Sequence, residues 1–264
     1  MKSGVVIIAI NNNLIDYVSM AKWSAQRIEK LLNLPTTLIT DKPVADSIFD
    51  KVILINKDSS NTKHYSDYQK TIPWHNNSRD SVYGLTPYDQ TLLLDADYVV
   101  NSQQLKILFD TSHDLLCPST AYDISNVDTI FSETFGKYHM PMMWATIMYF
   151  RKSGYSEYVF SLMQMIKHNW QHYRNLYQIS NKLYRNDFAL SIALNIVNGH
   201  SNSCPTLPWS MATVMPEHTV KQKDFDKFEV SYCKNNRGFY VNLVDQDFHA
   251  MNKKQLGELI ACNQ

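Results

Sequence analysis

The sequence predicts an α/β fold with a mostly parallel central sheet and helices on both faces. Apolar runs of strand length alternate with longer segments whose apolar residues recur at helical spacing, a pattern typical of strand–helix–strand units. Several runs are almost continuously apolar, as expected for strands that are covered on both faces. With 264 residues the chain can bury a large core, and no linker divides it, so we expect a single domain over residues 1–264.

The elements follow from local patterns in chain order. The apolar run Val5–Ile10 predicts the first strand, and the helical spacing of apolar residues in Ile15–Leu32 predicts a crossover helix after it. A further helix is expected to begin at Asn186 or Asp187, either of which could cap its N-terminus. The other predicted strands are Thr37–Asp41, Lys51–Asn56, Thr91–Val100 and Leu115–Pro118.

Two segments do not fit this alternation. The stretch Phe135–Tyr177 is rich in Met and aromatic residues, which favours core packing or the wall of an acceptor site. The stretch Glu217–Lys234 is polar and is interpreted as an excursion from the core, either a lid over a bound ligand or a solvated loop.

Composition excludes several classes of protein. The 25 basic and 25 acidic residues balance, so no overall field attracts nucleic acid or an anionic membrane. Val5–Ile10 is too short for the core of a signal peptide, and no apolar run reaches the length of a membrane span. We therefore expect a cytoplasmic protein with reduced thiols. Its four cysteines are widely spaced, without a Cys-x-x-Cys pair that would indicate a zinc site: Cys117, Cys204, Cys233 and Cys262.

The clearest chemical signal is a pair of carboxylates, Asp95 and Asp97, at the end of the apolar run that starts at Thr91. Two acids delivered by a buried strand would repel each other unless a divalent cation such as Mg²⁺ or Mn²⁺ binds between them. The alternative is an ordinary polar turn after a strand. The chain has only seven glycines and neither a Gly-x-Gly-x-x-Gly motif nor a P-loop, so phosphates would be held by metal and side chains.

The run from Arg79 to Asp97, RDSVYGLTPYDQTLLLDAD, resembles the nucleotide-sugar glycosyltransferases of GT-A type, most closely the group that contains glycogenin and the bacterial lipopolysaccharide galactosyltransferases. In that group a basic residue precedes the first metal-binding Asp at the spacing that Arg79 has. Further segments match the same group in the same order: Ile8–Asn11 with Asp16, Tyr17 and Ala21; Arg185–Leu190 with Asn195; Leu207–Trp209; and Asp247–Lys253.

The resemblance implies a GT-A-like fold, with a Rossmann-like donor-binding half at about residues 1–118 and an acceptor and metal-completing half at about 119–264. It implies metal binding by Asp95, Asp97 and His249, and a sugar-orienting or catalytic role for Asp187 and Asn186. Tyr17 would stack on the donor base. The implied donor-binding residues are Ala9, Ile10, Asn11, Tyr17, Arg79, Ala96 and Lys253.

Structural interpretations stand beside these roles. His249 could be a solvated loop histidine, Arg79 could pair with Asp80 at the surface, and Asp187 could act only as an N-cap. The segment Trp144–Tyr149 also lacks the Asn and Gly that the family carries there, and the His249 segment lacks the family's Gly. The transferred sugar and the stereochemical outcome therefore stay open.

The function predicted from these observations is a glycosyltransferase that uses Mn²⁺ or Mg²⁺ and a nucleotide-sugar donor, most simply a UDP-sugar. The acceptor is open and includes a glycan, a protein, a small molecule or a hydroxymethylated base in phage DNA. Two alternatives are a nucleotidyltransferase on a related fold and a non-enzymatic module that binds metal and nucleotide.

Overall fold

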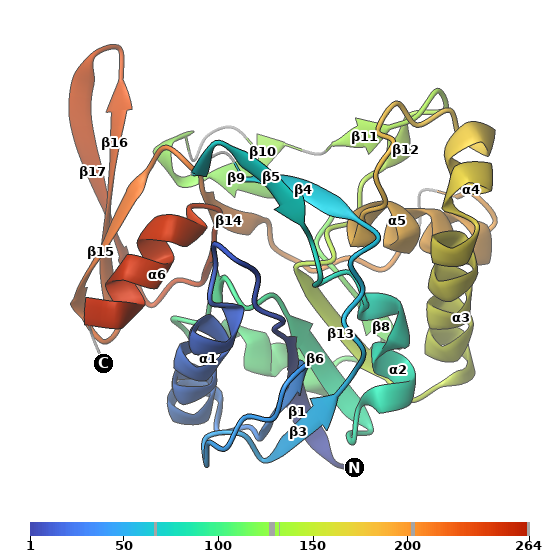
Figure 1. The fold of residues 1–264 in the computed structure, drawn as a ribbon, viewed down its shortest axis with the longest axis horizontal. Helices are drawn as coiled ribbons and strands as arrows, with labels where there is room; N and C mark the ends of the chain where they lie inside the picture. Colours follow the sequence, from blue (N-terminus) through green and yellow to red (C-terminus); the bar gives the residue numbers. More distant parts are fainter. Residues whose placement is uncertain (66–67, 127–129, 132, 202–203, 263–264) are drawn as a thin grey trace.

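The computed structural model describes residues 1–65, 68–126, 130–131, 133–201 and 204–262. Within these ranges, six strands form the central sheet in the order β3-β2-β1-β6-β13-β8 (Figure 1). The first four strands of this order run parallel, and β13 pairs antiparallel with both of its neighbours. The predicted mostly parallel sheet is thus confirmed. Its strands are β1 (Ser3–Ile8), β2 (Thr36–Thr40), β3 (Lys51–Leu54), β6 (Gln90–Leu94), β8 (Leu115–Leu116) and β13 (Ile147–Arg151).

The central sheet separates two hydrophobic cores. Leu92 and Leu94 of β6 contribute to one core, whereas Leu93 contributes to the other, as the period of two along a strand requires. The first core includes residues of α1 (Tyr17–Leu32) and α6 (Lys253–Cys262), and the second is built with α3 (Gly154–His168) and α5 (Asn186–Val197). Helices therefore cover both faces, as predicted (Figure 1).

A second sheet lies beside the central one, in the order β10-β9-β14-β18-β7. It corrects the prediction of one strand over Thr91–Val100, because β6 ends at Leu94 and the chain re-enters as β7 in the other sheet. The Tyr98 N–H donates back to the Asp95 carbonyl at 3.1 Å, which closes a tight turn around Ala96. The strands are β7 (Tyr98–Val99), β9 (Ala121–Asp123), β10 (Ile130–Phe131), β14 (Met211–Val214) and β18 (Phe248–Ala250).

The polar stretch Glu217–Lys234 is not a loop. It enters an antiparallel sheet of β15 (Thr219–Asp224), β16 (Lys227–Lys234) and β17 (Arg237–Val244), whose β16–β17 ribbon projects from the body (Figure 1). The expectation of a solvated loop was wrong because Val220, Phe228 and Val230 alternate with polar residues, and these three side chains are buried. A lid over a bound ligand stays a prediction.

The remaining elements are short. Met140, Met142, Met143 and Met148 are buried in the core on the α3 and α5 side, as the core-packing interpretation of this stretch expects. In the described residues, no helix combines the length and apolar character that crossing a bilayer requires. The short elements are β4 (Thr62–Tyr65), β5 (Lys70–Pro73), β11 (Thr134–Phe135), β12 (Met140–Pro141), α2 (Val82–Leu85), α4 (Trp170–Leu176) and the 3₁₀ turns Arg79–Ser81, Gln104–Asp110 and Ile124–Asn126.

Candidate active site

A cavity of about 460 Å³ lies where β6 ends, with walls from both sheets and from the β4–β5 hairpin. Carboxyl ends of parallel strands are the usual place for a ligand in an open α/β sheet. Its lining includes most of the residues singled out in the sequence: Tyr17, Arg79, Asp95, Ala96, Asp97, Asn186, Asp187, His249 and Lys253.

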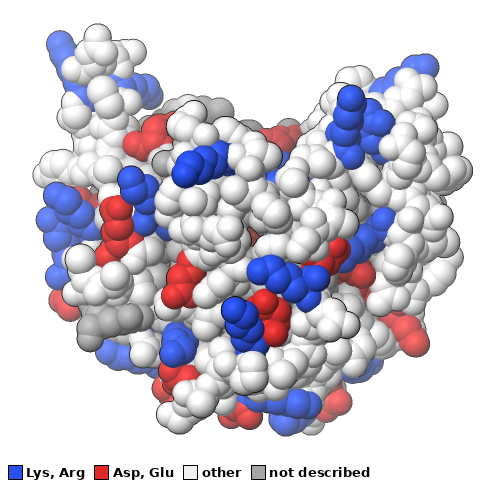
Figure 2. All heavy atoms as spheres, viewed as in Figure 1, with Lys and Arg blue, Asp and Glu red and all other residues white. Residues whose placement is uncertain are grey.

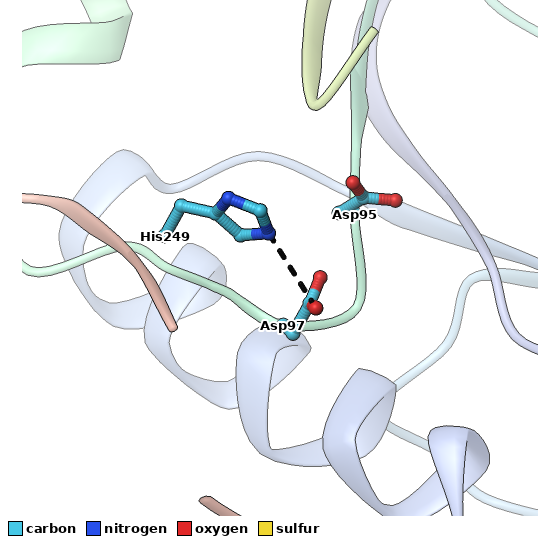
Figure 3. Close-up of side chains that lie close together, drawn as sticks. All are labelled: Asp95, Asp97 and His249. Carbon is cyan, nitrogen blue, oxygen red and sulfur yellow. Dashed lines mark ion pairs between the residues drawn. The ribbon is translucent and has the colours of Figure 1, made fainter. Parts of the chain in front are cut away.

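Three potential metal ligands meet at this cavity. Asp95 follows β6, Asp97 precedes β7, and β18 brings His249 beside them by pairing antiparallel with β7. One ligand atom from each of the three residues lies within 4.8 Å of the others. Figure 3 shows the His249 Nε2 atom pointing at Asp97, with 3.5 Å between Nε2 and Oδ2. His249 is therefore not a solvated loop residue.

Both carboxylates also face a cation from the protein. The guanidinium of Arg79 forms an ion pair with Asp95, and the ammonium of Lys253 forms one with Asp97. Burial opposes ionisation of Asp97, but Lys253 and His249 outweigh it and hold the pKa of the carboxyl group well below its usual value. Each of the two carboxylates is therefore neutralised by its own cation. The sequence spacing alone had suggested that the two carboxylates would repel each other.

The Arg79 side chain is held by contacts with Asp95 and Ala145 and not by its neighbour Asp80. Its side chain is buried and also donates to the Ala145 carbonyl at 2.7 Å, whereas Asp80 forms an ion pair with Lys167 at 3.2 Å. The surface ion pair with Asp80 that was the structural alternative for Arg79 is therefore excluded.

The donor set suits a hard divalent cation. Two carboxylates and one imidazole offer oxygen and nitrogen ligands that Mn²⁺ and Mg²⁺ accept. Because Arg79 and Lys253 already balance the charges of Asp95 and Asp97, a bound divalent ion would make the site net positive. Such a site attracts an anion of high charge, such as a diphosphate.

Asp187 and Asn186 lie at the start of α5, as predicted, but neither side chain caps the helix. The N-cap residue is Arg185, without a capping side-chain bond. The Asp187 carboxylate accepts the Ala145 N–H at 2.9 Å and pairs with Arg185 at 3.1 Å. Burial alone would raise the pKa of this carboxyl group, but Arg185 and the Ala145 N–H lower it below the usual value. The Asn186 amide donates to the Asn76 carbonyl at 3.2 Å.

The first strand and its turn contribute less to the cavity than expected. Tyr17 lines the wall with only 5% of its surface exposed, and its hydroxyl lies 3.2 Å from the Tyr65 hydroxyl. Ala9 and Ile10 are buried beside the cavity lining rather than in it. Asn11 accepts the Val18 N–H at 2.9 Å and lines a separate hollow of about 420 Å³.

Sequence reasoning missed the β4–β5 hairpin, which contributes Lys63 and Trp74 to the cavity. Burial, with the nearby charges of Lys253 and Arg185, lowers the pKa of Lys63 to about 7. Trp144 and Tyr184 line the cavity as well. Neither Thr62–Tyr65 nor Lys70–Pro73 shows the alternation of apolar and polar residues that predicts a strand, so the hairpin had no clear local signal.

Three solved glycosyltransferases share part of this chain trace. The galactosyltransferase LgtC, solved with donor and acceptor sugar analogues, is 12% identical, with 73% of this chain and 69% of that chain covered at a TM-score of 0.46. GlyE from Streptococcus pneumoniae TIGR4 is 12% identical, with 79% and 45% covered at 0.45. Mouse xyloside xylosyltransferase 1 is 10% identical, with 78% and 84% covered at 0.44.

The protein thus covers less than half of the length of GlyE. A search against protein-family models found no match, and neither did a search of curated proteins. The predicted likeness in fold to glycosyltransferases is found, and at these identities it concerns the course of the chain alone. The chemistry of the site has to be argued from its own residues.

Proposed function

We propose that this protein is a metal-dependent glycosyltransferase that takes a sugar from a nucleotide-sugar donor, most simply a UDP-sugar. The observation that carries the proposal is the convergence of Asp95, Asp97 and His249, with Arg79 and Lys253, on one cavity at the carboxyl edge of the central sheet. A site of three metal ligands and two fixed cations is suited to a nucleoside diphosphate.

The site residues fall into two groups. One group would act on the leaving nucleoside diphosphate and the other on the reacting sugar. A bound Mn²⁺ or Mg²⁺ would stabilise the negative charge that develops on the departing nucleoside diphosphate. Arg79 and Lys253 supply fixed positive charge to the same phosphates, since both are already oriented by a carboxylate. Tyr17 and Ala96 line the cavity, and we assign them to the nucleoside.

Asp187 is the proposed catalytic or sugar-orienting residue. Its carboxylate lines the cavity, and its lowered pKa keeps it ionised at neutral pH. An ionised carboxylate can accept a hydrogen bond from a sugar hydroxyl, or accept the proton of the acceptor hydroxyl as that oxygen attacks the anomeric carbon. Asn186 has its amide engaged by backbone, so its contribution would be to hold the start of α5 in place.

The deciding experiment measures release of nucleoside diphosphate from UDP-glucose, UDP-galactose and GDP-mannose with Mn²⁺, with Mg²⁺ and with EDTA. We expect UDP release that needs the metal and that is lost in Asp97→Asn. The matched control is Asp46→Asn, which removes a carboxylate that pairs with Lys22 outside the cavity.

Two outcomes would replace the proposal. Pyrophosphate formed from a nucleoside triphosphate and a sugar phosphate would indicate a nucleotidyltransferase. Binding of UDP and Mn²⁺ without release of UDP from any donor, with or without added acceptors, would indicate a binding module.

A further inference from the structure

The β16–β17 ribbon carries one continuous row of side chains on a single face. In its register Phe228 lies opposite Leu243, then Val230 opposite Val241, Tyr232 opposite Phe239, and Lys234 opposite Arg237. Residues that are paired in this way and two positions apart share a face. The row begins in the core, because Phe228, Val230 and Leu243 are buried, and it ends at the tip in an aromatic pair followed by a pair of cations.

The outer end of this row is energetically unfavourable in the unbound protein. The third strand, β15, pairs with β16 only as far as Ser231, so beyond that point the ribbon has two strands, which alone give marginal stability. Tyr232 and Phe239 stack with ring centroids 5.8 Å apart, and Phe239 is 44% exposed. Lys234 and Arg237 are directly opposite each other, where like charges repel.

These four residues and Asn235 line a hollow of about 550 Å³. Among the described residues, no acidic group forms an ion pair with Lys234 or Arg237. Asn235 and Asn236 both have positive φ, 53° and 59°, as a two-residue hairpin turn requires, which fixes the tip. Figure 2 shows basic side chains at the end of this projection. The hollow therefore combines a stacking surface with two cations that form no ion pair within the described part of the chain.

The hollow is connected with the candidate active site through a short path of contacts. Met215 lines the active-site cavity, and its N–H donates to Nδ1 of His218 at 3.3 Å. The His218 ring lies 5.6 Å from that of Tyr232, which stacks on Phe239. In this series of packed side chains, which runs through the buried His218, the aromatic pair comes before the cations at the tip.

We propose that this face of the ribbon, defined by Tyr232, Phe239, Lys234 and Arg237, binds an anionic glycan chain whose far end is the acceptor of sugar transfer, an inference that rests on the proposed function. The C–H face of a sugar ring stacks on an exposed aromatic side chain. A carboxylate or phosphate on the next residue of the chain would bind Lys234 and Arg237 and remove their repulsion.

Charge complementarity favours a glycan over a polynucleotide. A polynucleotide carries a phosphate on every residue and needs a continuous basic track. Figure 2 shows Lys and Arg mixed with Asp and Glu over the visible face, and the whole chain has 25 residues of each sign. Two cations at one tip match a ligand with sparse anions.

The test measures binding of the full-length protein, in EDTA and without donor, to hexasaccharides of oligogalacturonate and of hyaluronan by calorimetry. Maltohexaose serves as the neutral probe and a fifteen-residue oligothymidylate as the nucleic acid. We expect an acidic hexasaccharide to bind and maltohexaose to bind at least about tenfold more weakly. Lys234→Gln combined with Arg237→Gln should remove that difference, and Phe239→Ser should weaken both sugars.

The matched control is Tyr240→Ser. Tyr240 is adjacent to Phe239 and more exposed, at 67%, but pairs with Ser231 on the opposite face of the ribbon. Affinities should be unchanged in this variant. The proposal is overturned if neither acidic hexasaccharide binds, if Tyr240→Ser weakens binding as much as Phe239→Ser, or if oligothymidylate binds more tightly than both acidic sugars.

The ribbon test and the donor test fail separately. Donor hydrolysis without acceptor, measured on the wild-type protein and on Tyr240→Ser, reports on the proposed metal site alone. Acidic-glycan binding without any donor turnover would contradict the proposed function and support the ribbon as a binding site. Donor turnover without glycan binding would support the proposed function and contradict the role of the ribbon.

Discussion

At Asp187, two neighbours set the charge of a carboxylate that lines the cavity. Asp187→Asn keeps an oxygen that can accept the Ala145 N–H, so we expect a folded protein with wild-type affinity for UDP and Mn²⁺. Loss of the negative charge should lower the transfer rate by at least about 10²-fold, the lower range for a positioned acid or base. Single-turnover transfer assays on the folded variant measure this.

Arg185→Gln is the control for that prediction. It breaks the ion pair with Asp187 from the other side, at a side chain that is 44% exposed, and leaves the carboxylate in place. Its transfer rate should stay within a few-fold of wild type, because the Ala145 N–H and Arg79 still lower the pKa of the Asp187 carboxyl group. Equal losses in both variants would assign the effect to the ion pair and not to the carboxylate.

Lys253 gives a prediction that separates metal from phosphate. It pairs with Asp97 at the proposed metal site, so Lys253→Gln removes a cation that would compete with the metal. We expect Mn²⁺ alone to bind at least as tightly as in wild type. UDP in the presence of Mn²⁺ should bind about tenfold more weakly, because the phosphates lose the charged contact with Lys253. Calorimetry measures both affinities. The neighbouring exposed Lys254→Gln should change neither, and a parallel loss of Mn²⁺ affinity would contradict the assignment of Lys253.

On the scale of elements, a buried arginine joins the two segments that carry the proposed metal ligands. Arg27 of α1 is 1% exposed and donates to the Val100 carbonyl at 2.7 Å and to the Asn101 side chain at 2.5 Å. The backbone N–H groups of Asn101 and Ser102 in turn donate to Asp247 at 2.6 Å each. This network fixes the residues after β7 to the residue that precedes β18.

Arg27→Lys keeps the charge and loses the fork of donors, so β7 and β18 should be held less firmly. We expect Mn²⁺ affinity to fall by about tenfold, the lower range for residues behind a metal ligand. The Mn²⁺ spectrum in electron paramagnetic resonance should broaden at saturating metal. Arg151, at the end of β13, donates to the Thr111 carbonyl, and Arg151→Lys should lower stability without changing either measurement.

Prediction from sequence succeeded where one local pattern determined the element. The first strand and helix, the strands near Thr36 and Lys51, and the start of α5 are found within a few residues of their predicted places. The end of β6 was missed because Tyr98 and Val99 are as apolar as the strand before them, and only pairing with β18 assigns them to another sheet. Periodicity cannot show a change of partner.

The candidate site shows the same division. Asp95, Asp97 and His249 meet as the family resemblance implied. The pairing of Arg79 with Asp95, and the position of Lys63 over the cavity, depend on how distant segments fold together and have no local signal. Ala9 and Ile10 matched the resemblance in sequence, yet their side chains are buried in strand and turn packing.

For the whole molecule, a ligand that joins the two sheets should stabilise the native state. Two of the proposed metal ligands come from the turn between β6 and β7 and the third from β18, so unfolding separates them. UDP and Mn²⁺ together, at about one hundred times the dissociation constant, should add about 2.7 kcal/mol to the free energy of unfolding. Thermal melts should show an increase that EDTA abolishes. An increase with UDP in EDTA of the same size would argue against a metal-bridged diphosphate.

The pairing of His249 with Tyr98 joins positions separated by more than half of the chain. Contacts between such distant positions form late in folding, because the loop they close must first lose its freedom. The metal site is therefore expected to be unformed in the transition state. Mn²⁺ with UDP should then slow unfolding in denaturant jumps and leave the refolding rate unchanged. Faster refolding in the presence of the ion would mean that the two distant strands meet before the barrier.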